Sequence, residues 1–136
     1  MGVPKIAAGT IDAPIGKQPG TGGEKMQVDT EAGLKAKTRY RVIERAAGRA
    51  AWVEFLPLTG RTHQIRVHAQ HIGHPVAGDD KYGDPAVNKR LREQIGLKRL
   101  FLHAASLEFA LDAGKTPYVL NAPLADELVE ALDRLR

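Results

Sequence analysis

The chain has 136 residues and a formal net charge of +4; 43% of its residues are hydrophobic, 26% are charged and none is cysteine. This length suits one domain or half of a larger one, and no apolar run approaches the roughly 18 to 20 residues of a membrane span. The lack of cysteine excludes disulfides and thiolate metal sites, and residues 1–25 lack the apolar core of a signal peptide. We therefore expect a cytoplasmic protein without a membrane span.

The N-terminal part is expected to consist of loops and short strands. Residues 1–23 are rich in Gly and Pro, which predicts a loop-rich start with one short strand around residues 10–15. A brief strand is predicted at residues 25–28, followed by a turn.

A β-hairpin is predicted from residue 34 to residue 58. Residues 34–45 alternate with period two, which is typical of a half-buried strand. One face carries Thr38, Tyr40 and Val42, and the other carries Arg39, Arg41, Ile43 and Arg45. Residues 46–50 form a connection of hairpin length, and the apolar run 51–58 is expected to pair back antiparallel. The exposed face of the first strand would then be basic.

The densest chemistry lies in residues 59–83, TGRTHQIRVHAQHIGHPVAGDDKYG. A helix is predicted from Thr62, as N-cap, to Ile72. Its apolar face would hold Ile65, Ala69 and Ile72, and its polar face His63, Arg66 and Gln70. Gly73 ends the helix and Pro75 prevents its return, so residues 73–83 should form a loop.

The C-terminal part predicts two helices and two strands. A short basic helix spans residues 87–95 and closes at Gly96. Strands are expected at residues 100–111 and 118–121, separated by a turn at 114–117. A C-terminal amphipathic helix occupies residues 124–136, with Leu128 on its apolar side and Asp126 and Glu127 near its N-terminus. The fold class is therefore α+β, a mainly antiparallel mixed sheet with a few helices.

Charge is concentrated in the middle of the chain. Residues 35–70 contain eight Lys or Arg and two Glu, a local balance of +6. A field of one sign suits a polyanion such as RNA, although a solvated strand face with scattered basic residues would give the same count.

Two other patterns are weighed against structural explanations. Four histidines lie close in sequence (His63, His68, His71 and His74), but no carboxylate stands at the spacing of a zinc-binding helix, so we expect no metal site. His68 and His71 are expected to be packed side chains. Asp79 and Asp80 could act as acid and base, but a turn in which an Asp side chain bonds its own backbone is the favoured interpretation.

Three motifs carry a family resemblance: TGRTHQIRVH, GHPVAGDDKYG and RLFLHAASLEF (residues 99–109). They resemble the C-terminal catalytic-domain motifs of the RluA-type RNA pseudouridine synthases, over roughly residues 9–123. The stretch KYGDPAVNKRLREQIGLKRLFLHA is most similar to the branch that acts on large-subunit ribosomal RNA. The resemblance implies isomerisation of uridine to pseudouridine in RNA, with ribosomal RNA as the expected substrate and with no cofactor or metal.

Two motifs of that family are missing. Its catalytic aspartate lies in an Arg-Leu-Asp tripeptide, which occurs nowhere in residues 1–136, and its second motif, with a tyrosine near the target base, is also missing. The chain therefore resembles a partial catalytic domain that completes its site with a missing N-terminal half. We expect it to be inactive alone.

The resemblance also implies site residues. Arg66 corresponds to the arginine that pairs with the catalytic aspartate, a role that an ionised, buried carboxylate requires. Arg61, Thr62 and His63, at the expected helix N-terminus, would bind phosphate. The other expected RNA-binding residues are Gln70, Lys81, Tyr82, Leu102 and His103. A non-catalytic RNA-binding remnant and a metal-dependent hydrolase remain as alternatives.

Overall fold

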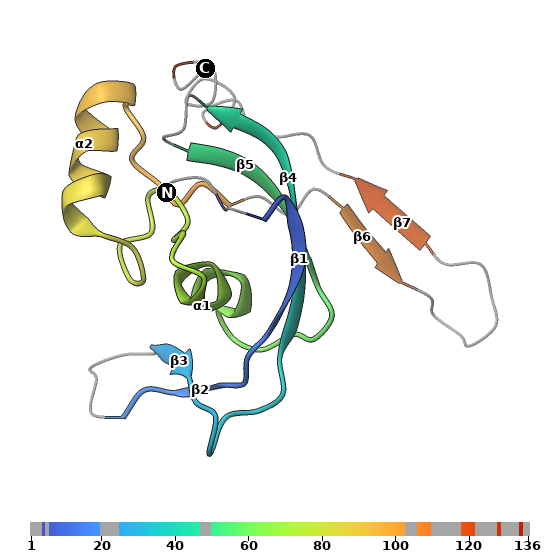
Figure 1. The fold of residues 1–136 in the computed structure, drawn as a ribbon. Coiled ribbons are helices and arrows are strands. Elements are labelled where there is room, and N and C mark those ends of the chain that lie inside the picture. Colours follow the sequence, from blue (N-terminus) through green and yellow to red (C-terminus); the bar gives the residue numbers. More distant parts are fainter. Residues whose placement is uncertain are drawn as a thin grey trace.

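The computed structural model describes residues 4, 6–19, 25–46, 50–102, 106–109, 118–121, 128 and 134. Its elements, in chain order, are β1 (Ala8–Asp12), β2 (Ile15–Lys17), β3 (Met26–Val28), β4 (Lys37–Ala46), β5 (Ala50–Pro57), α1 (Gln64–His71), α2 (Pro85–Ile95), β6 (Ser106–Phe109) and β7 (Tyr118–Asn121). Every strand pair is antiparallel among the residues described. The predicted α+β class is confirmed (Figure 1).

The main sheet has the order β1-β4-β5. Strand β4 alternates as predicted: Thr38 is fully buried, whereas Arg39, Arg41, Ile43 and Arg45 are exposed. The hairpin between β4 and β5 is confirmed, with a register irregularity between Val42 and Glu44. One face of this sheet packs on α1, and the other presents the basic side chains of β4.

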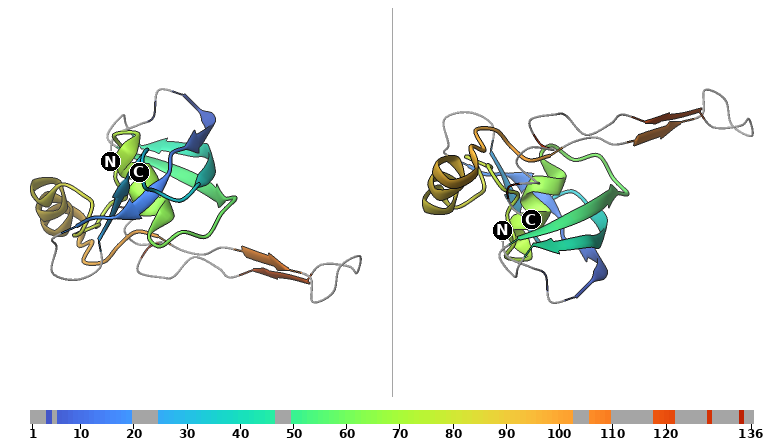
Figure 2. Two further views of the ribbon diagram at one scale, coloured as in Figure 1. Left: turned by 90° about the horizontal axis from the view of Figure 1, so that it is seen from below. Right: turned by 90° about the horizontal axis from the view of Figure 1, so that it is seen from above.

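Two smaller antiparallel pairs, β2-β3 and β6-β7, complete the described strands. The predicted short strands at 10–15, 25–28 and 118–121 correspond to β1 with β2, β3 and β7. In Figures 1 and 2, α2 and the β6-β7 pair lie at opposite ends of the molecule, with α1 and the main sheet between them. Helix α1 therefore occupies the centre.

The buried apolar side chains form two clusters. One contains Ile15 of β2, Ala36 just before β4, Val67 of α1 and Tyr82 of the loop after α1. The other joins α2 to the C-terminal part through Leu91, Ile95, Leu97 and Leu128. Fully burying one such aliphatic side chain stabilises a fold by about 1.5 to 3 kcal/mol. The loop after α1 contributes Tyr82 to the first cluster and packs Ala77 against the second, so it is held from both sides.

Helix α1 differs from the prediction at its start and on its buried face. It begins at Gln64, with His63 rather than Thr62 as N-cap, and the side chain of His63 makes no cap hydrogen bond. Its buried residues are Gln64, Val67, His68 and Ala69, whereas Ile65 and Ile72 are half-buried. The polar members of this face are buried because other segments supply their hydrogen-bond partners, which periodicity does not reveal. His71 is exposed, so its predicted packing is wrong.

Helix α2 begins two residues before the predicted start. Asp84 caps it by accepting a hydrogen bond from the backbone N–H of Ala86, at 2.8 Å, and Pro85 follows at the first helical position. Gly96 ends it with φ of 71°, as predicted.

The C-terminal predictions are confirmed in part. Residues 100–102 are not a strand, because the Phe101 backbone N–H bonds the carbonyl of Ala77 and its side chain packs against the α2 cluster. Leu128 is helical and fully buried, and Arg134 is helical and exposed. The predicted turn at 114–117 and the positions of Asp126 and Glu127 lie outside the described residues. Within the parts that are described, none of the helices has the length and apolar character to span a bilayer.

Candidate active site

Arg66 forms a two-point ion pair with Asp79. Its Nε donates to Oδ2 at 3.0 Å, and its Nη2 donates to Oδ1 at 2.8 Å. Helix α1 supplies the arginine, and the loop between α1 and α2 supplies the aspartate. The side chain of Arg66 is 20% exposed and that of Asp79 is 0% exposed. Such a planar fork on a carboxylate is among the strongest hydrogen-bonded pairs that side chains form.

Asp79 also organises its own loop. Its Oδ1 accepts the backbone N–H groups of Lys81 and Tyr82, each at 3.0 Å, so the predicted Asp turn is confirmed. The Asp79 carbonyl accepts from Nδ2 of Asn88 on α2, at 2.8 Å. Gly78 before it has φ of 78°, and an added Cβ would collide with the carbonyl oxygen of Arg99.

Both members of the pair are charged at neutral pH. Burial alone would raise the pKa of Asp79, but the hydrogen bonds from Arg66 and from the Tyr82 and Lys81 backbone outweigh it and lower that pKa. The same hydrogen bond to Asp79 raises the pKa of Arg66. The two side chains therefore form an ion pair in which both groups carry a full charge.

Tyr82 connects the pair to His63. The tyrosine is 2% exposed, and its ring centroid lies 5.1 Å from Cζ of Arg66, within the range of a cation–π contact. Its hydroxyl accepts the Met26 backbone N–H at 2.9 Å and lies 2.7 Å from Nδ1 of His63. His63 has φ of 53°, an uncommon conformation for a residue with a side chain. We call His63, Arg66, Asp79 and Tyr82 the ionic cluster.

A second polar group lies on the buried side of α1. Gln64 Oε1 accepts from the Thr59 hydroxyl at 2.6 Å and from the Arg61 backbone at 3.0 Å. Gln64 Nε2 donates to the Lys37 carbonyl at 2.8 Å and to Thr38 Oγ1 at 3.0 Å. Among the described residues, no buried side-chain nitrogen or oxygen lacks a partner.

His68 completes this second group. Its Nε2 lies 2.8 Å from the Ala13 carbonyl, which can only accept, so Nε2 carries the proton. Nδ1 then accepts from the Thr38 hydroxyl at 2.7 Å. Burial, the largest influence, lowers the pKa of His68, so the ring is neutral at neutral pH. We call Thr38, Thr59, Gln64 and His68 the neutral network; it joins β4 and the segment after β1 to α1.

The other expected RNA-binding residues are spread along the surface. Nε of Arg61 donates to the Lys35 carbonyl at 2.8 Å. Thr62, Gln70 and Lys81 are exposed, and Leu102 is half-buried. His103 lies outside the described residues. The structure thus brings Arg66, His63 and Tyr82 together, and their roles toward RNA stay predictions.

Sequence reasoning missed Asp79 as the partner of Arg66 and missed Gln64 altogether. Asp79 lies 13 positions after Arg66 and beyond the end of the helix, so helical spacing does not connect the two. The only available signal was the GDDKYG motif beside the helix. Within the described ranges, no three His, Asp or Glu side chains converge as a metal site would need.

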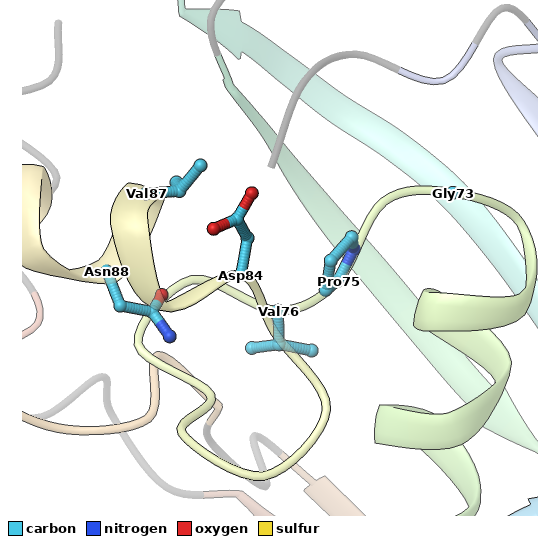
Figure 3. Close-up of a pocket in the computed structure, with 6 residues that line it drawn as sticks. All are labelled: Gly73, Pro75, Val76, Asp84, Val87 and Asn88. Carbon is cyan, nitrogen blue, oxygen red and sulfur yellow. The ribbon is translucent and has the colours of Figure 1, made fainter.

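A cavity of about 310 Å³ lies between the end of α1 and the start of α2, lined by Gly73, Pro75, Val76, Asp84, Val87 and Asn88 (Figure 3). None of the predicted site residues lines it. Both polar atoms of the Asn88 amide already have partners, Asp79 and Gly78. We therefore place the candidate site at the ionic cluster and not in this cavity.

Comparisons with known proteins cover most of the chain. It is 44% identical over 128 residues to "Ribosomal large subunit pseudouridine synthase C" of Salmonella typhi, which covers 93% of this chain and 40% of the relative. The protein of the same name from Vibrio vulnificus is 46% identical over 104 residues, which cover 76% of this chain and 32% of the relative. The chain thus spans 32% to 40% of the length of these curated relatives.

Solved structures agree with the fold. "Human RNA Pseudouridylate Synthase Domain Containing 4" superposes with a TM-score of 0.72 at 28% identity, over 98% of this chain and 58% of that chain. For "Human RNA Pseudouridylate Synthase Domain Containing 1" the TM-score is 0.65 at 31% identity, over 97% and 62%. The family described as "RNA pseudouridylate synthase" matches residues 3–71, just over half of the chain. The chain belongs to the RNA pseudouridylate synthase family.

Proposed function

We propose that this chain is the C-terminal part of a cytoplasmic enzyme that isomerises uridine to pseudouridine in ribosomal RNA. Arg66 binds and orients the carboxylate of an aspartate nucleophile that comes from an N-terminal half of the catalytic domain. The observation that carries the proposal is Arg66 itself, held by Asp79 and Tyr82 while 20% of its side chain remains exposed. The names of the curated relatives support ribosomal RNA as the substrate.

The reaction explains why such an arginine is needed. The N-glycosidic bond breaks, the uracil turns and reattaches through carbon, and the hydrogen on C5 leaves as a proton. The nucleophilic carboxylate must stay ionised in a site that excludes water, and a guanidinium both lowers its pKa and fixes its orientation. The target nucleotide is turned out of the RNA stack to reach this carboxylate.

The RNA surface is built from basic side chains outside the ionic cluster. Arg39, Arg41 and Arg45 are exposed on one face of β4. Lys89, Arg90 and Arg92 are exposed on α2. Each phosphate neutralised adds about 0.7 to 0.9 to the slope of log affinity against log salt, so binding should weaken steeply with salt. The RNA contacts predicted for Arg61, Thr62, His63, Gln70, Lys81, Tyr82, Leu102 and His103 remain part of this proposal.

Tritium release from ribosomal RNA labelled at uridine C5 tests the proposal. The chain alone should release none, and the complete enzyme, with the upstream half, should release it. In the complete enzyme Arg66→Ala should slow turnover by at least about 100-fold, because a lost active-site ion pair costs several kcal/mol on the barrier. Lys17→Ala, which removes one exposed positive charge on β2, is the control.

Three results would contradict the proposal. Release by the chain alone would mean that one of its own acids is the nucleophile. Full turnover in Arg66→Ala would remove the assigned role. Salt-sensitive RNA binding by the complete protein without any release would favour the alternative, an RNA-binding protein without chemistry, which the exposed face of β4 would explain equally well.

A further inference from the structure

The ion pair uses only one edge of the Arg66 guanidinium. An arginine has five N–H groups, and Asp79 accepts the one on Nε and one of the two on Nη2. The opposite edge, formed by Nη1 and the second N–H of Nη2, remains. Within the part of the chain that the structure describes, Nη1 has no hydrogen-bond partner. This edge can bind a second carboxylate without disturbing the first.

Asp79 holds the guanidinium from a rigid position. Its side chain is fully buried, and its Oδ1 accepts two backbone N–H groups in addition to Nη2 of Arg66. Asn88 of α2 bonds its carbonyl. Cζ of the guanidinium lies over the Tyr82 ring, 5.1 Å from the ring centroid. The plane and the in-plane rotation of the Arg66 head are therefore both restricted.

We propose that Asp79 is a positioning residue of the reaction. It binds one edge of Arg66 so that the other edge faces the nucleophilic carboxylate, and Arg66 bridges the two carboxylates. The inference rests on the proposed function, because it needs a nucleophile supplied from outside this chain. Ordering a free arginine side chain costs about 2 kcal/mol of rotamer entropy, and the contacts of Arg66 in the folded chain already account for part of this cost. The Arg66 side chain therefore does not have to be ordered during the reaction.

The same contacts exclude Asp79 as the nucleophile. Both of its oxygens accept from Arg66, one of them also accepts two backbone N–H groups, and the side chain is not exposed. An attacking oxygen needs an accessible lone pair, which Asp79 does not offer. Its carboxylate binds Arg66 and the backbone of its own loop.

Asp79→Asn in the complete enzyme isolates the positioning role. The amide oxygen can keep the bonds that Oδ1 makes to Nη2 and to the loop, while the amide nitrogen cannot accept from Nε. We expect kcat for tritium release to fall by about 100-fold, as a misplacement near 1 Å can cause, with KM within about threefold. Asp80→Asn is the matched control: the same change in the same loop, at an exposed side chain.

A double variant separates positioning from loop structure. In the Arg66→Lys background the two-edged fork is gone, so adding Asp79→Asn should change kcat by less than about twofold. An equal fall in both backgrounds would mean that Asp79 acts through the loop, and the inference would be overturned. It would also be overturned if Asp79→Asn turned over like Asp80→Asn in an active enzyme. No pseudouridine from the unsubstituted complete enzyme would instead refute the proposed function, and the inference with it.

Discussion

Two polar clusters meet at helix α1, and they differ in charge, in exposure and in how completely their hydrogen-bonding groups are paired. The neutral network contains no charged group and includes Thr38 and His68, both 0% exposed. The ionic cluster contains a full ion pair, and its arginine is 20% exposed. The side chains of the neutral network hydrogen-bond α1 to β4. In the ionic cluster, by contrast, one edge of the Arg66 guanidinium forms no hydrogen bond within the described residues.

This difference provides a criterion for separating polar groups that hold the fold from polar groups that can act on another molecule. In TGRTHQIRVH both kinds of residue alternate, and residue type alone does not separate Gln64 from Arg66. Saturated hydrogen bonding and complete burial indicate a role in the fold. Partial exposure with donors left over indicates a role toward another molecule. Four substitutions or titrations test this comparison, from the largest expected effect to the smallest.

Arg66→Ala should produce the largest loss of stability. It leaves the fully buried carboxylate of Asp79 without its counter-charge, which typically costs about 3 kcal/mol or more. Urea unfolding of the chain should show this loss, and Lys17→Ala should not. Adding Asp79→Asn should restore part of it, because the stranded charge is then gone. No recovery in the double variant would mean that the loss comes from packing of the arginine stem.

Gln64→Leu should destabilise the chain by about 2 kcal/mol, because it leaves the Arg61 N–H and the Thr59 hydroxyl without an acceptor in a partly buried place. Gln70→Leu is the matched control, being the same change on an exposed position of the same helix, and should stay within about 0.5 kcal/mol. Thermal or urea melts of both variants measure the difference. Equal effects would show that the neutral network adds nothing to stability.

The two clusters should weaken in different pH windows. The pKa of His68 is lowered in the fold, so its contribution is complete above about 6.5 and is lost as the pH falls below that value, at up to about 1.4 kcal/mol per pH unit. The pKa of Asp79 is also lowered, so its contribution persists until the pH falls below about 3.8. Urea melts between pH 7 and 5 should show a slope that His68→Gln reduces. His71→Gln, on the exposed side of α1, should reduce that slope much less, because the charge of His71 is a smaller cause of the lowered pKa of His68 than burial is.

Arg41→Ala should have the smallest effect, below about 0.5 kcal/mol. Its ion pair with Glu54 is 3.3 Å long, but the two side chains are 65% and 56% exposed, and water and salt screen such pairs. Thermal melts at low and high salt provide the measurement. A loss comparable with that of Arg66→Ala would show that burial is not what separates the two ion pairs.

Several local features were predictable because neighbours in sequence decide them. The alternation of β4, the hairpin into β5 and the end of α2 at Gly96 follow from side-chain direction and backbone preference. Periodicity was right only in part for α1: of the predicted apolar face, Ala69 is buried, whereas Ile65 and Ile72 are half-buried. The buried face includes Gln64 and His68, whose partners lie 27 and 55 positions away at Lys37 and Ala13.

The sequence by itself determined the family, the α+β class and the basic face of β4, and it predicted a role for Arg66. Only the tertiary structure decided which carboxylate meets Arg66 and which edge of the guanidinium remains. The reason is physical: a motif specifies residue types along a chain, whereas a hydrogen bond depends on the distance and angle between groups that folding brings together. Asp79 became the partner of Arg66 because Asn88 of α2 and two backbone N–H groups of its own loop fix it at the end of that side chain.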